Sequence, residues 1–174
     1  EDFQQNVKPA IGGLAKAMIT TPARLAAFKY KRTLDKMIKE KNIQGIKTLV
    51  AFSGSIKDEE GNTHTEKSLN HISTDGELRE LFDTPEYNIL IVAEKYQTGF
   101  DQPLLHTMYV DKQLQGIKAV QTLSRLNRYH PLKEETRVID FQNEVGKIKK
   151  SFAKFYTGTS LIDKVKPEFL IKLY

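Results

Sequence analysis

The sequence predicts an α/β fold in which a mainly parallel β-sheet is flanked by helices. The chain has 174 residues, 39% of them hydrophobic, which is enough for one domain with its own core. Short runs of β-forming residues alternate with segments of helical periodicity. The runs are apolar on both faces, as expected for strands that are covered by helices on two sides.

Composition excludes several classes of protein. The chain contains no cysteine, which excludes disulfide scaffolds, thiolate zinc sites and cysteine catalysis. The longest apolar run, Ile89–Ala93, is far shorter than the ~20 residues that span a bilayer. We therefore expect a soluble, cytoplasmic protein with no membrane partner. The first residues, Glu1–Gln4, have neither an initiator Met nor a signal-peptide layout, so we expect the chain to be a piece of a longer one.

The expected elements alternate along the chain. Strands are predicted over 17–19, 46–52, 89–92, 107–110 and 138–141. A first helix is expected with Thr21 as N-cap, Pro22 at its first helical position, and an end near Lys41. Two more helices are expected over 75–82 and 117–128.

Two segments do not fit this alternation. Residues 57–70 are charged and rich in turn residues, which indicates a surface insertion; the segment holds only fragments of a calcium-binding loop. Residues 144–156 have an amphipathic helical pattern. The apolar side carries Val145, Ile148, Phe152 and Phe155, and the lysines are Lys147, Lys149, Lys150 and Lys154. This helix packs on a domain or, alternatively, presents lysines to nucleic acid.

The common nucleotide and catalytic motifs are missing. The sequence has no Gly-x-x-x-x-Gly-Lys-Ser/Thr loop, no Gly-x-Ser-x-Gly elbow and no His-Glu-x-x-His motif. The four histidines are too widely spaced to form a local metal pair, so we expect no metal site. A self-contained active site is not visible.

The helix expected over 117–128 separates two kinds of side chain at about 100° per residue. One face carries Ala119, Leu123 and Leu126, and the opposite face carries Gln121, Arg125 and Arg128. The planar guanidinium groups suit a phosphate, so this face indicates an anionic partner. The alternative is a solvated or salt-bridged face.

A second segment places polar residues after a buried strand. The strand over 89–92 runs into a loop that contains Gly99, Asp101 and Pro103. Loops at the carboxyl ends of parallel strands are where open α/β sheets bind ligands. Asp101 suits a sugar hydroxyl or an arginine, and a structural turn is the competing interpretation.

Taken together, these segments resemble a known family. A strand is followed by Thr98-Gly99-Phe100-Asp101-Gln102-Pro103, then by a strand ending in Tyr109-Val110-Asp111-Lys112, and then by Gln121 to Arg128. This order resembles the second RecA-like domain of superfamily-two helicases. It looks most like the motor part of the R subunit of type I restriction–modification enzymes. The start of that subunit's domain resembles Lys16–Thr20 followed by the helix at Arg24. Its fourth helicase motif resembles Val50–Gly54. The resemblance implies a RecA-like three-layer domain of the P-loop NTPase type without its own P-loop.

The resemblance also implies roles for individual residues. Thr98, Gly99 and Asp101 fall on motif V, which links nucleotide and nucleic acid; Gln121, Arg125 and Arg128 fall on motif VI; Ser53 and Gly54 fall near the DNA backbone. Arg125 and Arg128 would be the catalytic residues, because they would stabilise charge on the transferring phosphoryl group of ATP. Gly99, Asp101 and Gln121 would contact the nucleotide, and Thr98 the DNA. The sequence departs from the common motif VI at Thr122, Ser124 and Asn127.

The same resemblance implies cofactors, partners and domain limits. ATP and Mg²⁺ would be bound mostly by a preceding RecA-like domain, with a nuclease domain elsewhere in the same chain, and these residues alone would be inactive. The parent would be an ATP-dependent double-stranded DNA translocase and site-specific deoxyribonuclease, acting with methylation and specificity subunits. We expect a lead-in at 1–13, the helicase domain at 14–143 and a helical extension at 144–174. The alternatives are the second domain of another DNA or RNA helicase, or a non-catalytic nucleic-acid-binding module.

Overall fold

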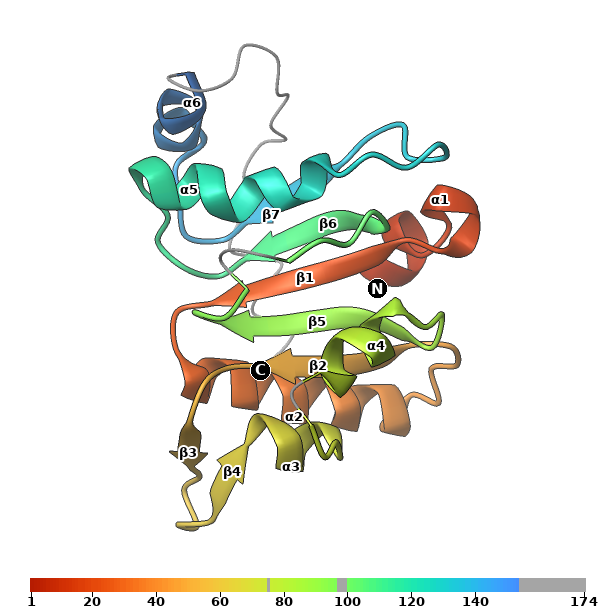
Figure 1. The fold of residues 1–174 in the computed structure, drawn as a ribbon, viewed down its shortest axis with the longest axis vertical. Helices are drawn as coiled ribbons and strands as arrows, with labels where there is room; N and C mark the ends of the chain where they lie inside the picture. The colour runs from red at the N-terminus through yellow and green to blue at the C-terminus, as the bar shows by residue number, and fades with distance from the viewer. Residues whose placement is uncertain (75, 97–99, 154–174) are drawn as a thin grey trace.

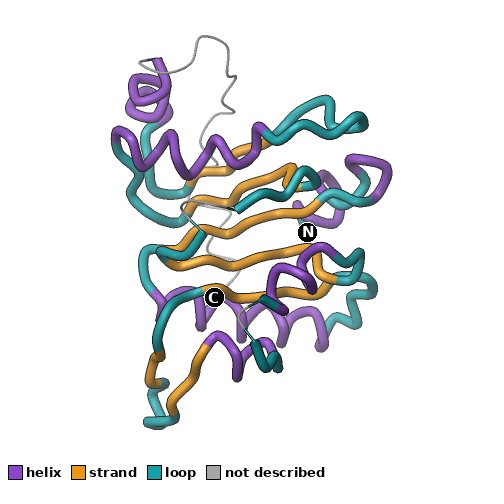
Figure 2. The backbone as a smooth tube through the Cα atoms, viewed as in Figure 1, coloured by secondary structure: helices purple, strands orange, loops and turns teal. Residues whose placement is uncertain are grey.

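A five-stranded parallel sheet forms the centre of the protein. The computed structural model describes residues 1–74, 76–96 and 100–153. The sheet consists of β1 (Lys16–Thr21), β2 (Lys47–Ala51), β5 (Tyr87–Ala93), β6 (Leu105–Val110) and β7 (Arg137–Asp140). Their order is β2-β5-β1-β6-β7, and every neighbouring pair is parallel (Figures 1 and 2). All five predicted strands and the predicted α/β class are confirmed.

Helices cover the two faces of the sheet and form a three-layer structure. The face toward the viewer in Figure 1 carries α4 (Glu77–Asp83) and α5 (Gly116–Leu123), and α2 (Arg24–Glu40) lies behind the sheet. Alternate residues of each strand enter different cores. Met18 and Leu90 belong to the core beneath α4 and α5, whereas Ala17 and Ile91 belong to the core beneath α2. This two-sided burial explains why the strands are apolar throughout.

The first long helix begins later than predicted. Ala23 is its N-cap and has no side-chain capping bond, so the expected cap at Thr21 is wrong. Thr21 is instead the last residue of β1, where its hydroxyl donates to the carbonyl of Val92 at 3.0 Å. Thr21 therefore lies in the strand, two residues before the N-cap position. The end of α2 at Glu40 agrees with the expected end near Lys41.

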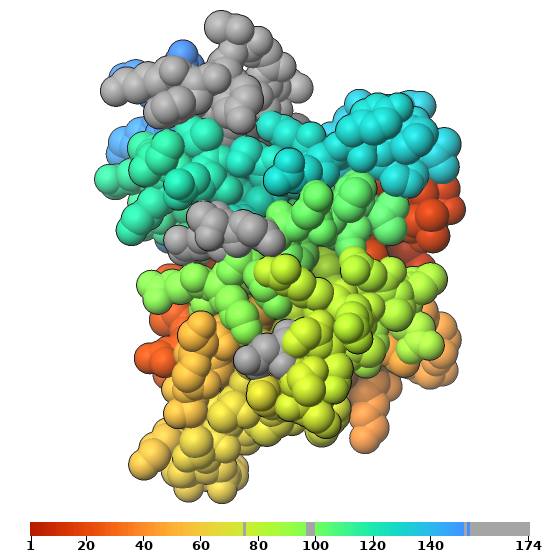
Figure 3. All heavy atoms as spheres, viewed as in Figure 1, coloured from red at the N-terminus to blue at the C-terminus, as the bar shows by residue number. Residues whose placement is uncertain are grey.

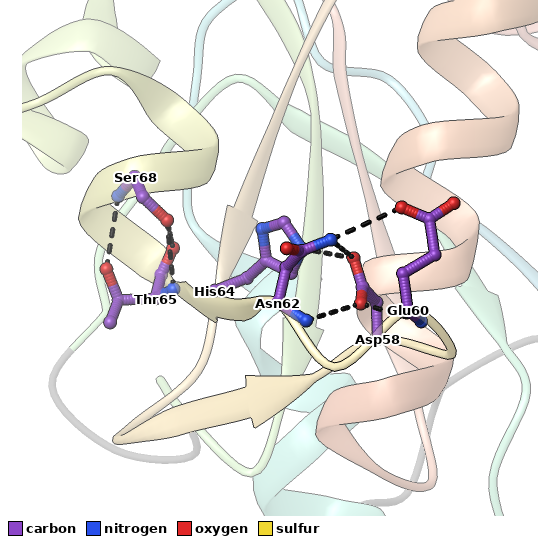
Figure 4. Close-up of polar contacts among 6 residues, drawn as sticks. All are labelled: Asp58, Glu60, Asn62, His64, Thr65 and Ser68. Atoms are coloured by element: carbon purple, nitrogen blue, oxygen red, sulfur yellow. Dashed lines mark hydrogen bonds and ion pairs between the residues drawn. The ribbon is translucent and has the colours of Figure 1, made fainter.

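The predicted surface insertion over 57–70 is in fact ordered. It contains the hairpin of β3 (Ser55–Lys57) and β4 (Thr63–Thr65), followed by α3 (Glu66–Asn70). The Asp58 carboxylate closes the hairpin, because it accepts the backbone N–H of Asn62 at 2.8 Å and contacts Nε2 of His64 at 2.8 Å (Figure 4). Thr65 and Ser68 form a capping box that starts α3. The turn residues of this segment therefore belong to a hairpin and a helix cap, not to an irregular loop.

Helix α3 protects the open edge of the sheet. Strand β2 is an edge strand, whose outward N–H and C=O groups would otherwise be exposed to other chains. The Asn70 side chain accepts the N–H of Val50 at 2.9 Å and donates to its carbonyl at 2.7 Å. One side chain therefore replaces a neighbouring strand at this position.

Both ends of the described chain pack against the same domain. The N-terminal turns η1 (Phe3–Val7) and α1 (Ala10–Gly13) contribute Phe3, Val7 and Ile11 to the core beneath α2. The last helix, α6 (Val145–Ala153), packs on α5 and buries Ile148, as its predicted amphipathic pattern requires. Phe155 and Lys154, two residues of that pattern, lie outside the described residues. The division of the chain at residues 13 and 143 stays a prediction.

Candidate phosphate-facing site

The predicted site residues gather around the ends of several strands and along α5. Ser53 and Gly54 follow β2, and Asp101 lies in the connection between β5 and β6. Thr98 and Gly99 lie outside the described residues. In Figure 3, the described part of the β5–β6 connection lies between α5 and α4, on the face that Figure 1 turns to the viewer.

The predicted polar face of the 117–128 helix is only partly correct. The α-helix ends at Leu123, and residues Ser124–Asn127 form the 3-10 turn η2. A 3-10 turn has about three residues per turn, which rotates the side chains relative to an α-helix. Gln121 and Arg128 are exposed as expected, but Arg125 is only 6% exposed and faces the protein. The expected burial of Ala119, Leu123 and Leu126 is confirmed.

Arg125 is a buried cation that has no ion-pair partner among the described residues. Within the described part of the chain, no hydrogen bond or ion pair joins its guanidinium to another residue. Its side chain borders a cavity of about 10 Å³, which is also lined by Thr20, Glu94 and Lys112. Burial, and then the nearby charge of Arg128, lower the pKa of Arg125 to about 10. The group stays charged at neutral pH, and an anion bound beside it would offset the unfavourable burial.

Arg128 is held by the other predicted segment. Its Nε lies 3.1 Å from Oδ1 of Asp101, and the two side chains are 56% and 71% exposed. The structure therefore joins the loop after β5 to the residue that follows η2, and Asp101 meets an arginine, one of the two partners expected for it. Because this ion pair is exposed, it is weak and Arg128 can leave Asp101 for a stronger anion.

Lys112 extends the positive charge and was missed by the sequence reasoning. It follows β6 directly after Asp111 and borders the same cavity as Arg125. Burial lowers the pKa of Lys112, and the charges of Lys118 and Arg125 act in the same direction, whereas Glu94 opposes them. A lysine at the carboxyl end of a parallel strand was the signal that could have identified it.

The Ser53–Gly54 turn lies at the carboxyl end of β2 and is exposed. The carbonyl of Ser53 accepts a hydrogen bond from Nη1 of Arg24 at 3.1 Å. Gly54 has φ +79°, and a Cβ at this position would lie 2.9 Å from the same Nη1. The backbone conformation therefore favours glycine. Arg24, in the first turn of α2, adds a positive charge beside this turn that the sequence reasoning did not assign to the site.

The described residues contain no metal-binding cluster. No group of three or more His, Asp or Glu side chains in residues 1–74, 76–96 and 100–153 is placed to hold a metal ion. None of the described helices has the length and apolar character needed to cross a membrane.

The fold of the chain is the RecA-like fold that is seen in the second domains of helicases. The C-terminal domain of the DEAD-box protein Dbp5 superposes with a TM-score of 0.53 at 11% identity, covering 89% of this chain and 77% of that one. Domain 2 of the DEAD-box helicase Mss116p, solved with an RNA duplex, gives a TM-score of 0.51 at 19% identity, covering 91% and 55%. At these identities the likeness concerns the fold, and the predicted RecA-like class is confirmed.

Sequence comparisons point to a more specific likeness. Residues 70–143 match the family described as type I restriction enzyme subunit R domain 3. The MjaVIIP endonuclease subunit of Methanocaldococcus jannaschii, named as a type I restriction enzyme, is 32% identical over 142 residues, covering 72% of this chain and 13% of the relative. A Staphylococcus aureus type I restriction enzyme endonuclease subunit is 35% identical over 85 residues, covering 41% and 9%. The resemblance to the R subunit is confirmed, and the chain spans about 13% of the length of its first relatives.

Proposed function

We propose that this chain is part of the ATP-dependent DNA translocase motor of a type I restriction enzyme R subunit. One observation carries the proposal: Arg125, in the 3-10 turn η2 that ends just before Arg128, is a buried guanidinium without an ion-pair partner among the described residues. A buried cation beside the inner strands of a RecA-like sheet would favour the binding of an anion. The triphosphate of ATP, bound mainly by a preceding domain, has the matching charge.

The two arginines would have different tasks. Arg125 is fixed by burial, so it would provide a preorganised positive charge beside the phosphates. Arg128 is exposed and is bound, among the described residues, to Asp101 alone, so it would exchange that carboxylate for the γ-phosphoryl group when the cleft between the domains closes. Charge that builds up on the phosphoryl oxygens during transfer would then be stabilised. Gln121, which is exposed earlier on α5, would add an amide donor.

The DNA side of the proposal rests on the turn after β2. Ser53 and Gly54 are exposed there beside Arg24, and Thr98 is assigned to the same side by motif alone. Double-stranded DNA would contact backbone and hydroxyl groups at this edge. The recognition sequence would be read by a specificity subunit, which acts with a methylation subunit, and a nuclease domain of the same parent chain would cut the DNA.

The test is the DNA-stimulated ATPase of the intact parent polypeptide assembled with its partner subunits. We expect Arg128→Ala to lower turnover on the order of 10³-fold while nucleotide and DNA binding are largely kept. Arg125→Ala should have a similar effect. The matched control is Arg32→Ala on α2, an exposed arginine whose guanidinium lies over the ring of Phe28, and it should retain activity.

Other outcomes would support the competing functions. If duplex RNA but not DNA stimulates turnover, the chain is part of another helicase. If turnover is unchanged in Arg128→Ala and Arg125→Ala, but DNA binding weakens and its salt dependence falls, both arginines hold the nucleic-acid backbone instead. That result would favour a non-catalytic binding module.

A further inference from the structure

We propose that Lys95 and Glu66 are positioning residues that couple the DNA-side turn at Ser53–Gly54 to Arg128 on the nucleotide side. Neither Lys95 nor Glu66 was among the predicted site residues. The inference rests on the proposed function, because it assigns a route between two sites of that function. It is carried by a continuous series of contacts between described residues.

The first contact joins Glu66 to the end of β2. Glu66 is the first residue of α3 and is only 5% exposed. Its Oε2 accepts the backbone N–H of Phe52 at 2.9 Å. Phe52 directly precedes Ser53, so the carboxylate fixes the backbone at the point where the exposed turn begins.

The second contact joins Glu66 to the loop after β5. The Lys95 ammonium group donates to both carboxylate oxygens of Glu66, at 2.7 and 2.8 Å. Residues on either side of Lys95 adopt left-handed backbone conformations, with φ 54° at Glu94 and 58° at Tyr96. Such conformations are strained for residues other than glycine and persist only where surrounding contacts hold them. The Lys95–Glu66 pair is such a contact.

The third step leads from Lys95 to Arg128. The ring of Tyr96 packs against that of Phe100, with centroids 4.9 Å apart. Phe100 is buried and directly precedes Asp101, which holds Arg128. A displacement at Ser53 can therefore reach Arg128 through groups that touch one another, and the turn at Lys95 is the part of this route where the backbone is strained.

The ion pair between Lys47 and Glu86 differs from the Lys95–Glu66 pair in exposure and in location. Lys47 and Glu86 also join β2 to the start of β5, but both side chains are more than half exposed and lead to neither predicted site. This pair supplies the matched control, because Lys47→Met removes an ion pair on the same strand without touching the proposed route.

The experiment measures DNA-stimulated and basal ATPase in the intact parent complex. We expect Lys95→Met to keep basal turnover and the KM for ATP within about twofold, and to lower the stimulation by DNA about tenfold, within the usual range of coupling between two sites. Lys95→Arg should restore stimulation, because it can pair with Glu66. Glu66→Gln combined with Lys95→Met should lose little more than either change alone, since the two residues act as one unit. Lys47→Met should behave as wild type.

Wild-type protein provides a second measurement that does not depend on how well the variants fold. Hydrogen–deuterium exchange of the peptide that contains Phe52 should change when a non-hydrolysable ATP analogue binds in the absence of DNA. The inference is overturned if this peptide does not respond, or if folded Lys95→Met retains full stimulation. In either case Arg128→Ala tests the proposed function separately. If the turnover of this variant collapses, only the coupling route is rejected. If its turnover is unchanged, the proposed ATP-dependent motor function is rejected as well.

Discussion

The Nε atom of Arg128 lies 3.1 Å from Oδ1 of Asp101, so an ion pair joins the two predicted motifs. Both side chains are mostly exposed, and an exposed pair of this kind stabilises a protein by only about 0–1 kcal/mol. The pair matters for geometry, because the Asp101 carboxylate fixes the position of the Arg128 guanidinium. The pair can be removed without disturbing the core.

Asp101→Asn should therefore affect turnover and leave stability unchanged. We expect DNA-stimulated ATP hydrolysis by the parent complex to fall about tenfold, less than for Arg128→Ala, because the arginine remains but is no longer oriented. Thermal unfolding of the variant should match that of wild type. Glu86→Gln, which breaks the exposed pair with Lys47, is the control and should keep full turnover. Equal turnover in Asp101→Asn and wild type would contradict a positioning role.

Gly54→Ala should weaken duplex DNA binding and lower stability. The φ of +79° costs an alanine about 1 kcal/mol, and the new Cβ would press on the end of the Arg24 side chain, which can move. Gly61 is a matched control, since it has φ +87° and an added Cβ there would meet no atom within 4 Å. Chemical denaturation should show a similar loss for both variants, whereas only Gly54→Ala should reduce DNA affinity. A similar affinity in the two variants would remove Gly54 from the DNA side.

Asn70→Ala should be strongly destabilising. The change removes both partners of the Val50 backbone, and leaving buried polar groups unsatisfied costs about 1–3 kcal/mol each. We expect a loss of about 2–3 kcal/mol in the free energy of unfolding, measured by urea denaturation. Asn6→Ala, which removes an exposed hydrogen bond to Asp2, should cost far less. If the two losses are equal, the edge of β2 does not depend on Asn70.

Lys16 predicts how stability changes with pH. Its side chain is buried, and its ammonium group donates to the carbonyls of Thr84 and Tyr87 at 2.8 and 2.7 Å. Burial lowers the pKa of Lys16 to about 8 from 10.5, with the charge of Asp83 acting in the opposite direction. Between these two values the unfolded chain binds more protons than the folded one, so the free energy of unfolding rises with pH.

The comparison with Lys16→Met isolates this contribution. Between pH 7 and 10, wild type should gain stability relative to the variant by on the order of 1 kcal/mol, because the neutral amine no longer carries the cost of burying a charge. Urea denaturation at a series of pH values measures the difference. A difference that is constant, or that shrinks as the pH rises, would contradict the depressed pKa.

Much of the fold was predictable because it depends on local patterns. Strands buried on both faces must be apolar throughout, and the five runs that met this condition are the five strands of the sheet. The elements that the sequence predicted wrongly depend on distant partners. Threonine is a common helix cap, but Thr21 is the last residue of β1, where its hydroxyl donates a hydrogen bond to the carbonyl of Val92 in the neighbouring strand.

The sequence by itself determined the α/β class, the strands, and the relation of Thr98–Pro103 and Gln121–Arg128 to the R-subunit family, because these features lie within short stretches of chain. Only the tertiary structure decided that Arg125 is buried, that Arg128 meets Asp101, and that Lys95 binds Glu66 across 29 positions of sequence. Helix type and burial depend on what packs against each residue. Contacts between distant segments carry no periodic signal along the chain, so they emerge only when the sheet brings its strands together.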